Sequence, residues 1–374
     1  MKEDKTMTEL FTKKSLKLNE FSNREFLWRG WSSPSNIALV KYWGKRDIQI
    51  PENPSVSFTL SKCSSNTIVI CSPKIKERPS RTFFFDGKKA TEFGKKVFKL
   101  IEIVSVDFPV LSQYDLQVIS ENTFPHSSGI ASSASSMSSL ALCLCDLLQT
   151  INADFETESF FQLASKYARL GSGSACRSVF GEVVLWGQTE SFSGSSNDFA
   201  VPVDGMPDMF KTFRDSVLII SSDEKSVSSS AGHSLMNDHP FKEVRYQNAK
   251  DNCQKILEQM KSNKLSDWGE LVEREALELH GLMMNGRNSF ILMKPNTLKV
   301  IELVRKFRQK NQLPLYFTLD AGPNVHLLYP DEFQKPVKQF IENELVTLCE
   351  NGVWFDDHVG TGPSRLLQDG IDAQ

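Results

Sequence analysis

The segment that most constrains this chain is a run of small residues that leads directly into a long apolar helix. Residues 125–134 read Pro-His-Ser-Ser-Gly-Ile-Ala-Ser-Ser-Ala. From about Gly129 to Gln149, apolar side chains recur at alternating intervals of four and three residues. This spacing predicts a helix with one buried stripe, which needs a globular core to pack against. The stripe consists of Ile130, Ala134, Met137, Ala141, Leu144 and Leu148.

The start of this helix is a candidate anion site. A helix N-terminus carries free N–H groups and roughly half a positive charge, so it attracts phosphate. Gly129 lets the backbone approach a ligand closely, and serine hydroxyls can donate to phosphate oxygens or ligate Mg²⁺. The alternative is a serine-rich cap on an ordinary core helix. The segment is not a Walker A motif, because no Gly-Lys-Ser/Thr follows, and no G-x-G-x-x-G follows a strand.

The order of the predicted elements indicates an α+β fold, because strands and then helices dominate without regular βαβ alternation. Length favours about two domains. We expect an N-terminal extension over 1–25, an N-terminal domain over 26–205 and a C-terminal domain over 206–374. Strands are predicted at 37–40, 56–60, 67–71, 81–85, 116–120, 180–186, 216–222, 315–319, 325–328 and 351–356, and helices at 91–104, 129–149, 155–170, 241–262, 265–280, 296–311 and 332–344.

Composition excludes several classes of protein. Lys and Arg total 43 against 46 Asp and Glu, which gives a net charge of −3 and argues against nucleic-acid binding. We expect no membrane partner, because Asp146 interrupts the longest apolar run, Leu140–Leu148, well short of the roughly 20 residues that span a bilayer. Seven scattered cysteines without a secretory signal favour reduced thiols and a cytoplasmic location. No Cys/His set has zinc spacing, so we predict no protein metal site.

Lys41, Tyr42 and Lys45 form a candidate anion-binding segment at the end of the apolar strand 37–40. Two ammonium groups and a phenol within five residues can converge on one phosphate group. A solvated basic turn is the alternative.

Two more segments carry groups that can bind or act on an anionic substrate. Ser172, Ser174 and Arg177 share a glycine-containing loop, and hydroxyl donors with a forked guanidinium suit a carboxylate or phosphate. Asp320 opens a tight turn between two apolar strands, which would hold its carboxylate firmly in place. The alternatives are a loop with a surface arginine and an ordinary turn-forming aspartate.

The segment at 125–134 resembles the ATP loop of the galactokinase, homoserine kinase, mevalonate kinase and phosphomevalonate kinase superfamily. Segments 35–46, 171–178 and 320–324 narrow this resemblance to the diphosphomevalonate decarboxylase family. The resemblance runs from about residue 32 to 330, in the order of the family. The three segments read Ser-Asn-Ile-Ala-Leu-Val-Lys-Tyr-Trp-Gly-Lys-Arg, Gly-Ser-Gly-Ser-Ala-Cys-Arg-Ser and Asp-Ala-Gly-Pro-Asn.

The resemblance implies roles for particular residues. ATP with Mg²⁺ would be bound by Ser127, Ser128, Gly129, Ile130, Ala131, Ser132 and Ser133. The substrate would be bound by Tyr42, Trp43, Gly44, Lys45, Ser172, Gly173, Ser174, Ala175, Cys176, Arg177, Ser229 and Ser230. The catalytic residues would be Asp320, Lys41 and Arg177, with Asp320 near the C3 hydroxyl and Arg177 on the carboxylate that leaves as CO₂.

The implied reaction is ATP-dependent decarboxylation of mevalonate 5-diphosphate to isopentenyl diphosphate. The implied fold has a part like domain 2 of ribosomal protein S5, a ferredoxin-like part and an active site in the cleft between them. A homodimer is also implied. The alternatives are a decarboxylase of mevalonate 5-phosphate, a mevalonate 3-kinase, and a member that binds ligands without catalysis.

One segment departs from the family pattern. Ser230 stands where many bacterial members carry Arg and many eukaryotic members carry Thr, and His233 replaces the usual Met. His233 could contact phosphate or could simply pack. The 44 serines cluster in the same regions, with eight in 127–139 and seven in 221–234. We interpret these clusters mainly as neutral phosphate contacts.

Overall fold

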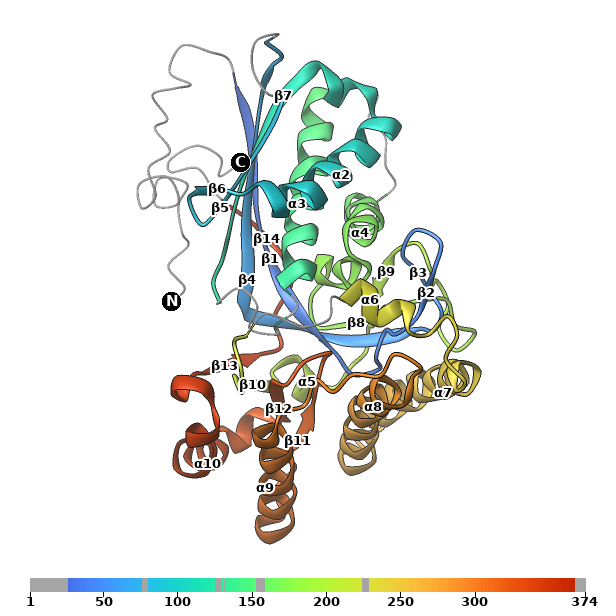
Figure 1. The fold of residues 1–374 in the computed structure, drawn as a ribbon, viewed down its shortest axis with the longest axis vertical. Helices are drawn as coiled ribbons and strands as arrows, with labels where there is room; N and C mark the ends of the chain where they lie inside the picture. The colour runs from blue at the N-terminus through green and yellow to red at the C-terminus, as the bar shows by residue number, and fades with distance from the viewer. Residues whose placement is uncertain are drawn as a thin grey trace.

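The computed structural model describes residues 26–75, 80–124, 130, 132–152, 159–223 and 229–366. The fold is α+β, as the sequence predicts: two sheets lie at opposite ends of the molecule, each with its own helices (Figure 1). Four calls on the ATP loop, Ser127, Ser128, Gly129 and Ala131, fall outside the described residues. The same holds for the side chains of Ser229 and Ser230.

The N-terminal sheet has the order β14-β1-β4-β7-β5-β6, and β8 and β9 extend it from the first half of β4. All its pairings are antiparallel except β5 with β7. The strands are β1 (Leu27–Ala38), β4 (Ser55–Pro73), β5 (Arg81–Phe85), β6 (Lys88–Lys89), β7 (Tyr114–Asn122), β8 (Val183–Trp186), β9 (Ala200–Pro202) and β14 (Ser364–Arg365), with a separate small pair β2 (Lys45–Arg46) and β3 (Ile50–Pro51).

The prediction of two strands at 56–60 and 67–71 is wrong, because both belong to the single 19-residue strand β4. The residues between the two predicted strands are mostly polar. The register with β1 shifts between Pro34 and Asn36, and this irregularity absorbs the intervening residues. The buried carboxylate of Asp357 accepts N–H bonds from Ser61 and Cys63 at 3.0 and 2.7 Å, so the backbone groups at the irregularity stay satisfied.

Three helices lie on one side of the N-terminal sheet: α2 (Thr91–Asp107), α3 (Ser132–Ile151) and α4 (Phe160–Gly171) (Figure 1). The predicted stripe of α3 is confirmed, because every member from Ile130 to Leu148 is buried. By length and composition α3 could cross a membrane, contrary to our expectation that no apolar stretch approaches that length. Its apolar window is 78% buried inside the protein, which is typical of a core helix.

Buried hydroxyls attach α3 to the sheet. The Ser138 and Ser33 hydroxyl oxygens lie 2.6 Å apart, and the Ser139 hydroxyl lies 2.6 Å from that of Thr67. Ser135 pairs with Ser65 at 2.7 Å. Ser135, Ser138 and Ser139 have no exposed surface. Our interpretation of the serine cluster as phosphate contacts is therefore wrong for these three residues: their hydroxyls bond to hydroxyls of the sheet inside the core.

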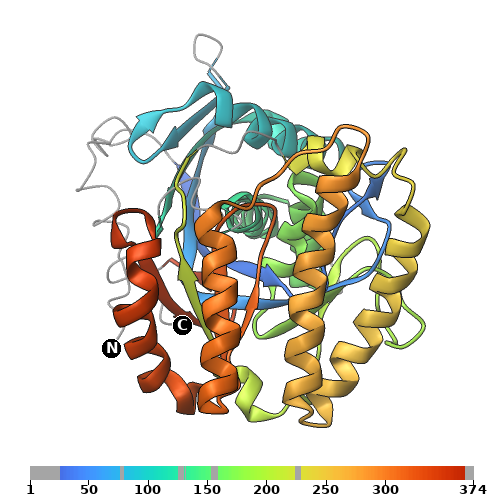
Figure 2. The same ribbon diagram turned by 60° about the horizontal axis from the view of Figure 1, so that its bottom comes forward.

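The C-terminal sheet has the order β11-β12-β10-β13, and helices α7, α8, α9 and α10 cover it in a row (Figure 2). The strands are β10 (Arg214–Leu218), β11 (Tyr316–Thr318), β12 (Val325–Tyr329) and β13 (Trp354–His358), and the helices are α5 (Asp208–Lys211), α6 (Ser229–Ser234), α7 (Lys242–Lys261), α8 (Leu265–Asn285), α9 (Pro295–Asn311) and α10 (Gln334–Phe340). Short 3₁₀ helices are η2 (Pro109–Gln113), η3 (Gly173–Val179), η4 (Asp331–Phe333), η6 (Val346–Leu348) and η7 (Glu350–Gly352), and η5 (Ile341–Leu345) is a π turn.

The two halves share an aromatic core. Phe58 of β4 lies 5.7 Å from Phe213 and 6.0 Å from Trp268 of α8, measured between ring centroids. β9 still pairs within the first sheet, whereas β10 belongs to the second, and β14 returns to pair with β1. The shared core fixes the end of β1 against α8, and this contact positions the site described next.

Candidate active site

The centre of the candidate site is an ion pair between residues 279 positions apart in the sequence. Lys41 follows β1, and its Nζ donates to the Asp320 carboxylate at 3.1 Å and to the Ala38 carbonyl at 2.6 Å. The Lys41 side chain is 2% exposed and that of Asp320 is 28% exposed. The carboxylate can therefore meet a ligand directly, while the ammonium group lies behind it.

Burial lowers the pKa of Lys41, and the neighbouring carboxylate of Asp320 offsets part of this lowering. An ammonium group removed from water needs a counter-ion, and Asp320 supplies it. The turn after β11 sets the position of that carboxylate, since the Gly322 N–H donates to the Asp320 carbonyl at 2.7 Å. The sequence prediction of a carboxylate held by strand and turn agrees with this geometry.

Arg177 lies on η3, close enough to act electrostatically on both members of the pair. Its guanidinium is buried and donates to Asn36 Oδ1 at 3.2 and 3.1 Å and to Ser55 Oγ at 2.5 Å. Burial lowers the pKa of Arg177, and the charge of Asp320 counteracts this. The three predicted catalytic residues are thus brought together, although they come from three distant segments.

His233 packs as a neutral ring in this structure. Its ring centroid lies 4.3 Å from that of Tyr42 and 4.9 Å from that of Trp43. Its Nδ1 accepts the Gly44 N–H at 3.1 Å, so the proton of the neutral ring is on Nε2. Burial, helped by the charge of Lys45, lowers the pKa of His233 to about 3. Of the two roles that the sequence left open for His233, phosphate contact and packing, the structure supports packing.

The predicted substrate segment approaches its neighbours closely. Gly44 has φ +95°, and a Cβ there would lie 2.3 Å from the Tyr246 hydroxyl oxygen. Lys45 Nζ donates to Gln49 Oε1 at 3.1 Å. Burial and then the charges of Lys96 and Lys99 lower the pKa of Lys45. Positive charge is therefore concentrated here even though the chain as a whole is slightly acidic.

The loop before η3 lies beside the start of α3. The hydroxyl oxygens of Ser172 and Ser133 are 3.4 Å apart, which places the predicted substrate loop next to the predicted ATP loop. The Ser174 carbonyl accepts from Asn36 Nδ2 at 3.1 Å. Ala175 and Cys176 are buried, and Cys176 Sγ donates to the Gly173 carbonyl at 3.0 Å. Burial raises the pKa of Cys176 to about 12, so its thiol is not a nucleophile.

A small cavity of about 90 Å³ lies between the start of α3 and the inner face of the sheet. Sequence reasoning missed it, because residues 81–85 were predicted only as a strand and residues 91–104 only as a helix. Aromatic residues on alternate positions of that strand were the available signal. The lining consists of Thr67, Phe83, Phe85, Lys96, Val97, Val118, Ser120, Ser132, Ser133, Ser136, Met137 and Leu140. Ile130, also predicted to contact ATP, is buried, and its carbonyl accepts from Ser35 Oγ at 2.9 Å.

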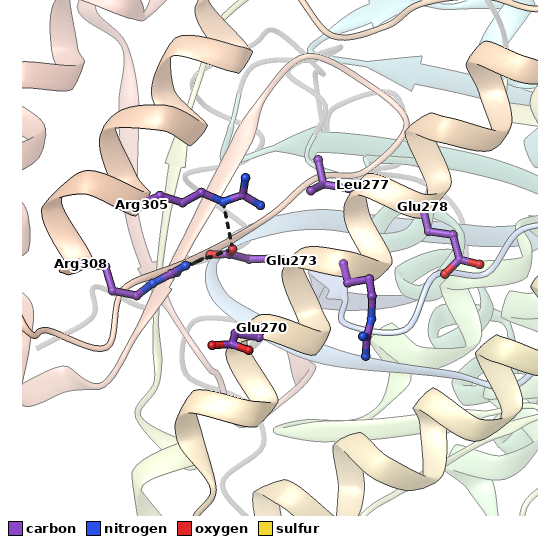
Figure 3. Close-up of a pocket in the computed structure, with 7 residues that line it drawn as sticks. Glu270, Glu273, Leu277, Glu278, Arg305 and Arg308 are labelled. Atoms are coloured by element: carbon purple, nitrogen blue, oxygen red, sulfur yellow. Dashed lines mark hydrogen bonds and ion pairs between the residues drawn. The ribbon is translucent and has the colours of Figure 1, made fainter.

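A larger hollow of about 540 Å³ lies between α8 and α9, and none of its lining residues belongs to the candidate site (Figure 3). Glu273 pairs there with Arg308 at 2.5 Å and with Arg305 at 3.5 Å. Leu277 is the one apolar side chain among the lining residues. Because its charges largely pair with one another, we do not assign the chemistry to this hollow. In the described part of the chain, no group of three or more His, Cys, Asp and Glu residues could hold a metal ion.

Comparisons with known proteins fit this geometry. The family model for the diphosphomevalonate decarboxylase-like N-terminal domain matches residues 33–198, and that for the mevalonate 5-diphosphate decarboxylase C-terminal domain matches residues 216–356. Diphosphomevalonate decarboxylase of Gibberella zeae is 30% identical over 320 residues, which cover 80% of each chain. This chain belongs to the diphosphomevalonate decarboxylase family.

Solved structures of diphosphomevalonate decarboxylases have the same fold. The Staphylococcus aureus mevalonate diphosphate decarboxylase aligns with a TM-score of 0.79 at 26% identity, covering 92% of this chain and 99% of that chain. A structure of MDDEF in complex with MVAPP, AMPPCP and magnesium aligns with a TM-score of 0.78 at 26% identity, covering 91% of this chain and 99% of that chain. The family match spans both halves, including the segments that carry Lys41, Arg177 and Asp320.

Proposed function

We propose that this protein is an ATP-dependent diphosphomevalonate decarboxylase. Its substrates are mevalonate 5-diphosphate and ATP, and its products are isopentenyl diphosphate, ADP, phosphate and CO₂. The observation that carries the proposal is the partly exposed Asp320 carboxylate, held by buried Lys41 within electrostatic reach of buried Arg177, in a chain of this family. A non-catalytic binding protein would have no need for this arrangement of a solvent-facing acid beside two buried cations.

The nucleotide binds at the start of α3. Ser132 and Ser133 are the first two residues of this helix, where free N–H groups and hydroxyls attract phosphate. The adjoining cavity offers Phe83, Phe85 and Val97 for the flat face of a base, and Lys96 for a phosphate or ribose oxygen. These hydroxyls would also hold the Mg²⁺ that accompanies ATP, which neutralises charge on the phosphates.

The first step transfers the γ-phosphoryl group of ATP to the tertiary C3 hydroxyl, which is otherwise a poor leaving group. Asp320 accepts a hydrogen bond from this hydroxyl, orients it and takes its proton as the oxygen bonds to the γ-phosphorus and ADP leaves. Phosphoryl transfer depends mainly on positioning and charge stabilisation. Lys41 supplies positive charge beside the transferred group and pairs with the Asp320 carboxylate at 3.1 Å.

The second step removes CO₂ and phosphate together. The bond between the carboxyl carbon and C2 breaks, its electron pair forms the C2–C3 double bond, and the C3–oxygen bond to phosphate breaks. Arg177 holds the carboxylate before it leaves. Its guanidinium is fixed in advance by Asn36 and Ser55, so little reorganisation is needed.

The 5-diphosphate end binds near Tyr42 and Lys45. The pKa of Lys45 is lowered by burial and then by the charges of Lys96 and Lys99, which therefore lie nearby. Because Lys96 lines the nucleotide cavity, we assign Lys45 and Lys99 to this end, and two cations suit the charge of a diphosphate better than that of a monophosphate. Ser172 and Ser174 complete the substrate loop, with the main chain of Ala175 and Cys176 as their support. We further propose that Ser229 and Ser230 contribute hydroxyls to this end.

The finer description of the fold belongs to the same proposal. We assign an N-terminal part, 26–205, like domain 2 of ribosomal protein S5, and a ferredoxin-like C-terminal part, 206–374. The active site lies in the cleft between them. We also propose a cytoplasmic homodimer.

Product analysis tests the proposed function. The purified protein is incubated with ATP, Mg²⁺ and mevalonate 5-diphosphate, and in parallel with mevalonate 5-phosphate. ADP and CO₂ in equal amounts from the diphosphate are expected. CO₂ from the monophosphate alone would identify a monophosphate decarboxylase, and ADP without CO₂ would identify a 3-kinase. Formation of neither product from either substrate would refute the assignment.

A further inference from the structure

Helix α8 holds the main chain of both members of the central ion pair. The buried carboxylate of Glu275 accepts the Lys41 N–H at 3.0 Å. Five residues further along the helix, His280 Nε2 lies 3.1 Å from the Asp320 carbonyl oxygen. A carbonyl oxygen can only accept, so His280 carries its proton on Nε2. One rigid helix thus contacts two segments that are far apart in the sequence.

A second helix fixes the Glu275 carboxylate. Arg245 of α7 donates to both its oxygens, at 2.9 and 2.8 Å, and also to the Lys41 carbonyl at 2.9 Å. Asn252 Nδ2 adds a bond to Oε1 at 2.6 Å. The Arg245 and Glu275 side chains have no exposed surface. The main chain of Lys41 is therefore held at both its N–H and its carbonyl group.

Apolar packing supports the same arrangement. Trp43, two residues after Lys41, and Ala321, next to Asp320, belong to one apolar cluster. The α8 residues Leu279, Leu282 and Met283 belong to the same cluster. Side chains on both sides of the ion pair thus rest on the same helix.

We propose that Glu275, Arg245 and His280 are positioning residues, and that α8 sets the distance between Lys41 and Asp320 for the phosphoryl-transfer step. This inference rests on the proposed function. A buried ion pair often adds little stability compared with an apolar pair of similar size, so stability alone is a weak reason to bury Arg245 and Glu275 here. A displacement of about 1 Å at a reacting group can cost on the order of 100-fold in rate. The three residues hold only main-chain atoms of the pair, so they affect turnover more than substrate binding.

The test compares His280→Phe, which removes the donor, with His280→Gln, which can replace it. The matched control is His239→Phe. His239 is equally buried and bonds to the Leu282 carbonyl of the same helix at 3.1 Å, but it does not contact the ion pair. We expect kcat to fall about 10- to 100-fold in His280→Phe, with KM for either substrate within about threefold. His280→Gln should recover most of kcat, and His239→Phe should keep the wild-type kcat.

A second variant tests the same inference in case His280→Phe does not fold. Arg245→Met combined with Glu275→Leu removes both buried charges at similar volume, and the same fall in kcat with unchanged KM is expected. Wild-type kcat in either folded variant, or an equal loss in His239→Phe, would overturn the inference. An inactive wild-type protein would instead refute the proposed function, so the two failures are distinguishable.

Discussion

Substitution of three buried serines of α3 tests whether the serine-rich helix is built for packing or for phosphate binding. The variant combines Ser135→Ala, Ser138→Ala and Ser139→Ala. These hydroxyls bond to Ser65, Ser33 and Thr67 in the sheet. We expect a loss of stability with no change in the KM for ATP.

The magnitude follows from what each partner retains. Ser33 still donates to the Ser178 carbonyl at 3.0 Å, and Thr67 keeps its bond to Ser120 at 3.0 Å. Ser65 keeps Asn122 Oδ1 at 2.7 Å. Since no partner is left unsatisfied, each substitution removes about 1 kcal/mol. Alanine regains about 0.5 kcal/mol of helix propensity at each position. The net loss is therefore about 1.5 kcal/mol for the triple variant, if the three sites add.

The assay is urea unfolding followed by tryptophan fluorescence, together with the KM for ATP. The matched control is Ser133→Ala, because Ser133 is exposed at the start of the same helix. It should leave the free energy of unfolding unchanged within about 0.5 kcal/mol. A hydrogen bond to a charged phosphate contributes about 1.5–3 kcal/mol, so its KM for ATP should rise at least about tenfold. If the triple variant raised the KM as much as the control and kept its stability, our account of these serines would be refuted.

Asp320→Ala should abolish turnover while leaving affinity for a non-hydrolysable ATP analogue within about threefold by calorimetry, and residual turnover above about 1% would contradict its role. Val97→Asp should raise the KM for ATP at least tenfold, since a carboxylate in the small cavity by α3 would repel the nucleotide, and an unchanged KM would place the base elsewhere. Burial lowers the pKa values of His233 and His280 to about 3 and about 4, so from pH 6.5 downward the unfolded chain binds protons that the folded chain refuses. The free energy of unfolding should fall by about 2 kcal/mol per histidine between pH 7.5 and 5, and a His233→Phe variant with the wild-type slope in urea titrations would contradict this.

The chemistry of the candidate site could be predicted from sequence to a large extent. Lys41, Arg177 and Asp320 stand in motifs whose residue types suit anion binding and acid–base work, and the structure brings them together. Their pairing could not be read from the chain, because it depends on how β1, η3 and β11 meet in space. The cavity lined by Phe83 and Phe85 was missed for the same reason, since each residue alone looks like an ordinary strand residue.

The supports of the site were also beyond sequence reasoning. Glu275 and His280 lie in a helix that reads as a regular amphipathic segment, and neither stands in a recognisable motif. Their importance comes from main-chain contacts to Lys41 and Asp320, and main-chain contacts leave no signature in residue type. His233 shows a different case: its residue type left phosphate contact and packing both open, and burial between Tyr42 and Trp43 keeps it neutral.

The sequence by itself determined the α+β class, the long core helix α3 with its buried stripe, and the kinds of side chain available for binding phosphate. Local periodicity and residue chemistry are properties of neighbouring positions, so they can be read directly from the chain. Only the tertiary structure decided which serines of that helix face the sheet and which remain at its open end. The direction of a hydroxyl depends on what packs against it, and for Ser138 and Ser139 the partners lie in strands at least 72 positions away.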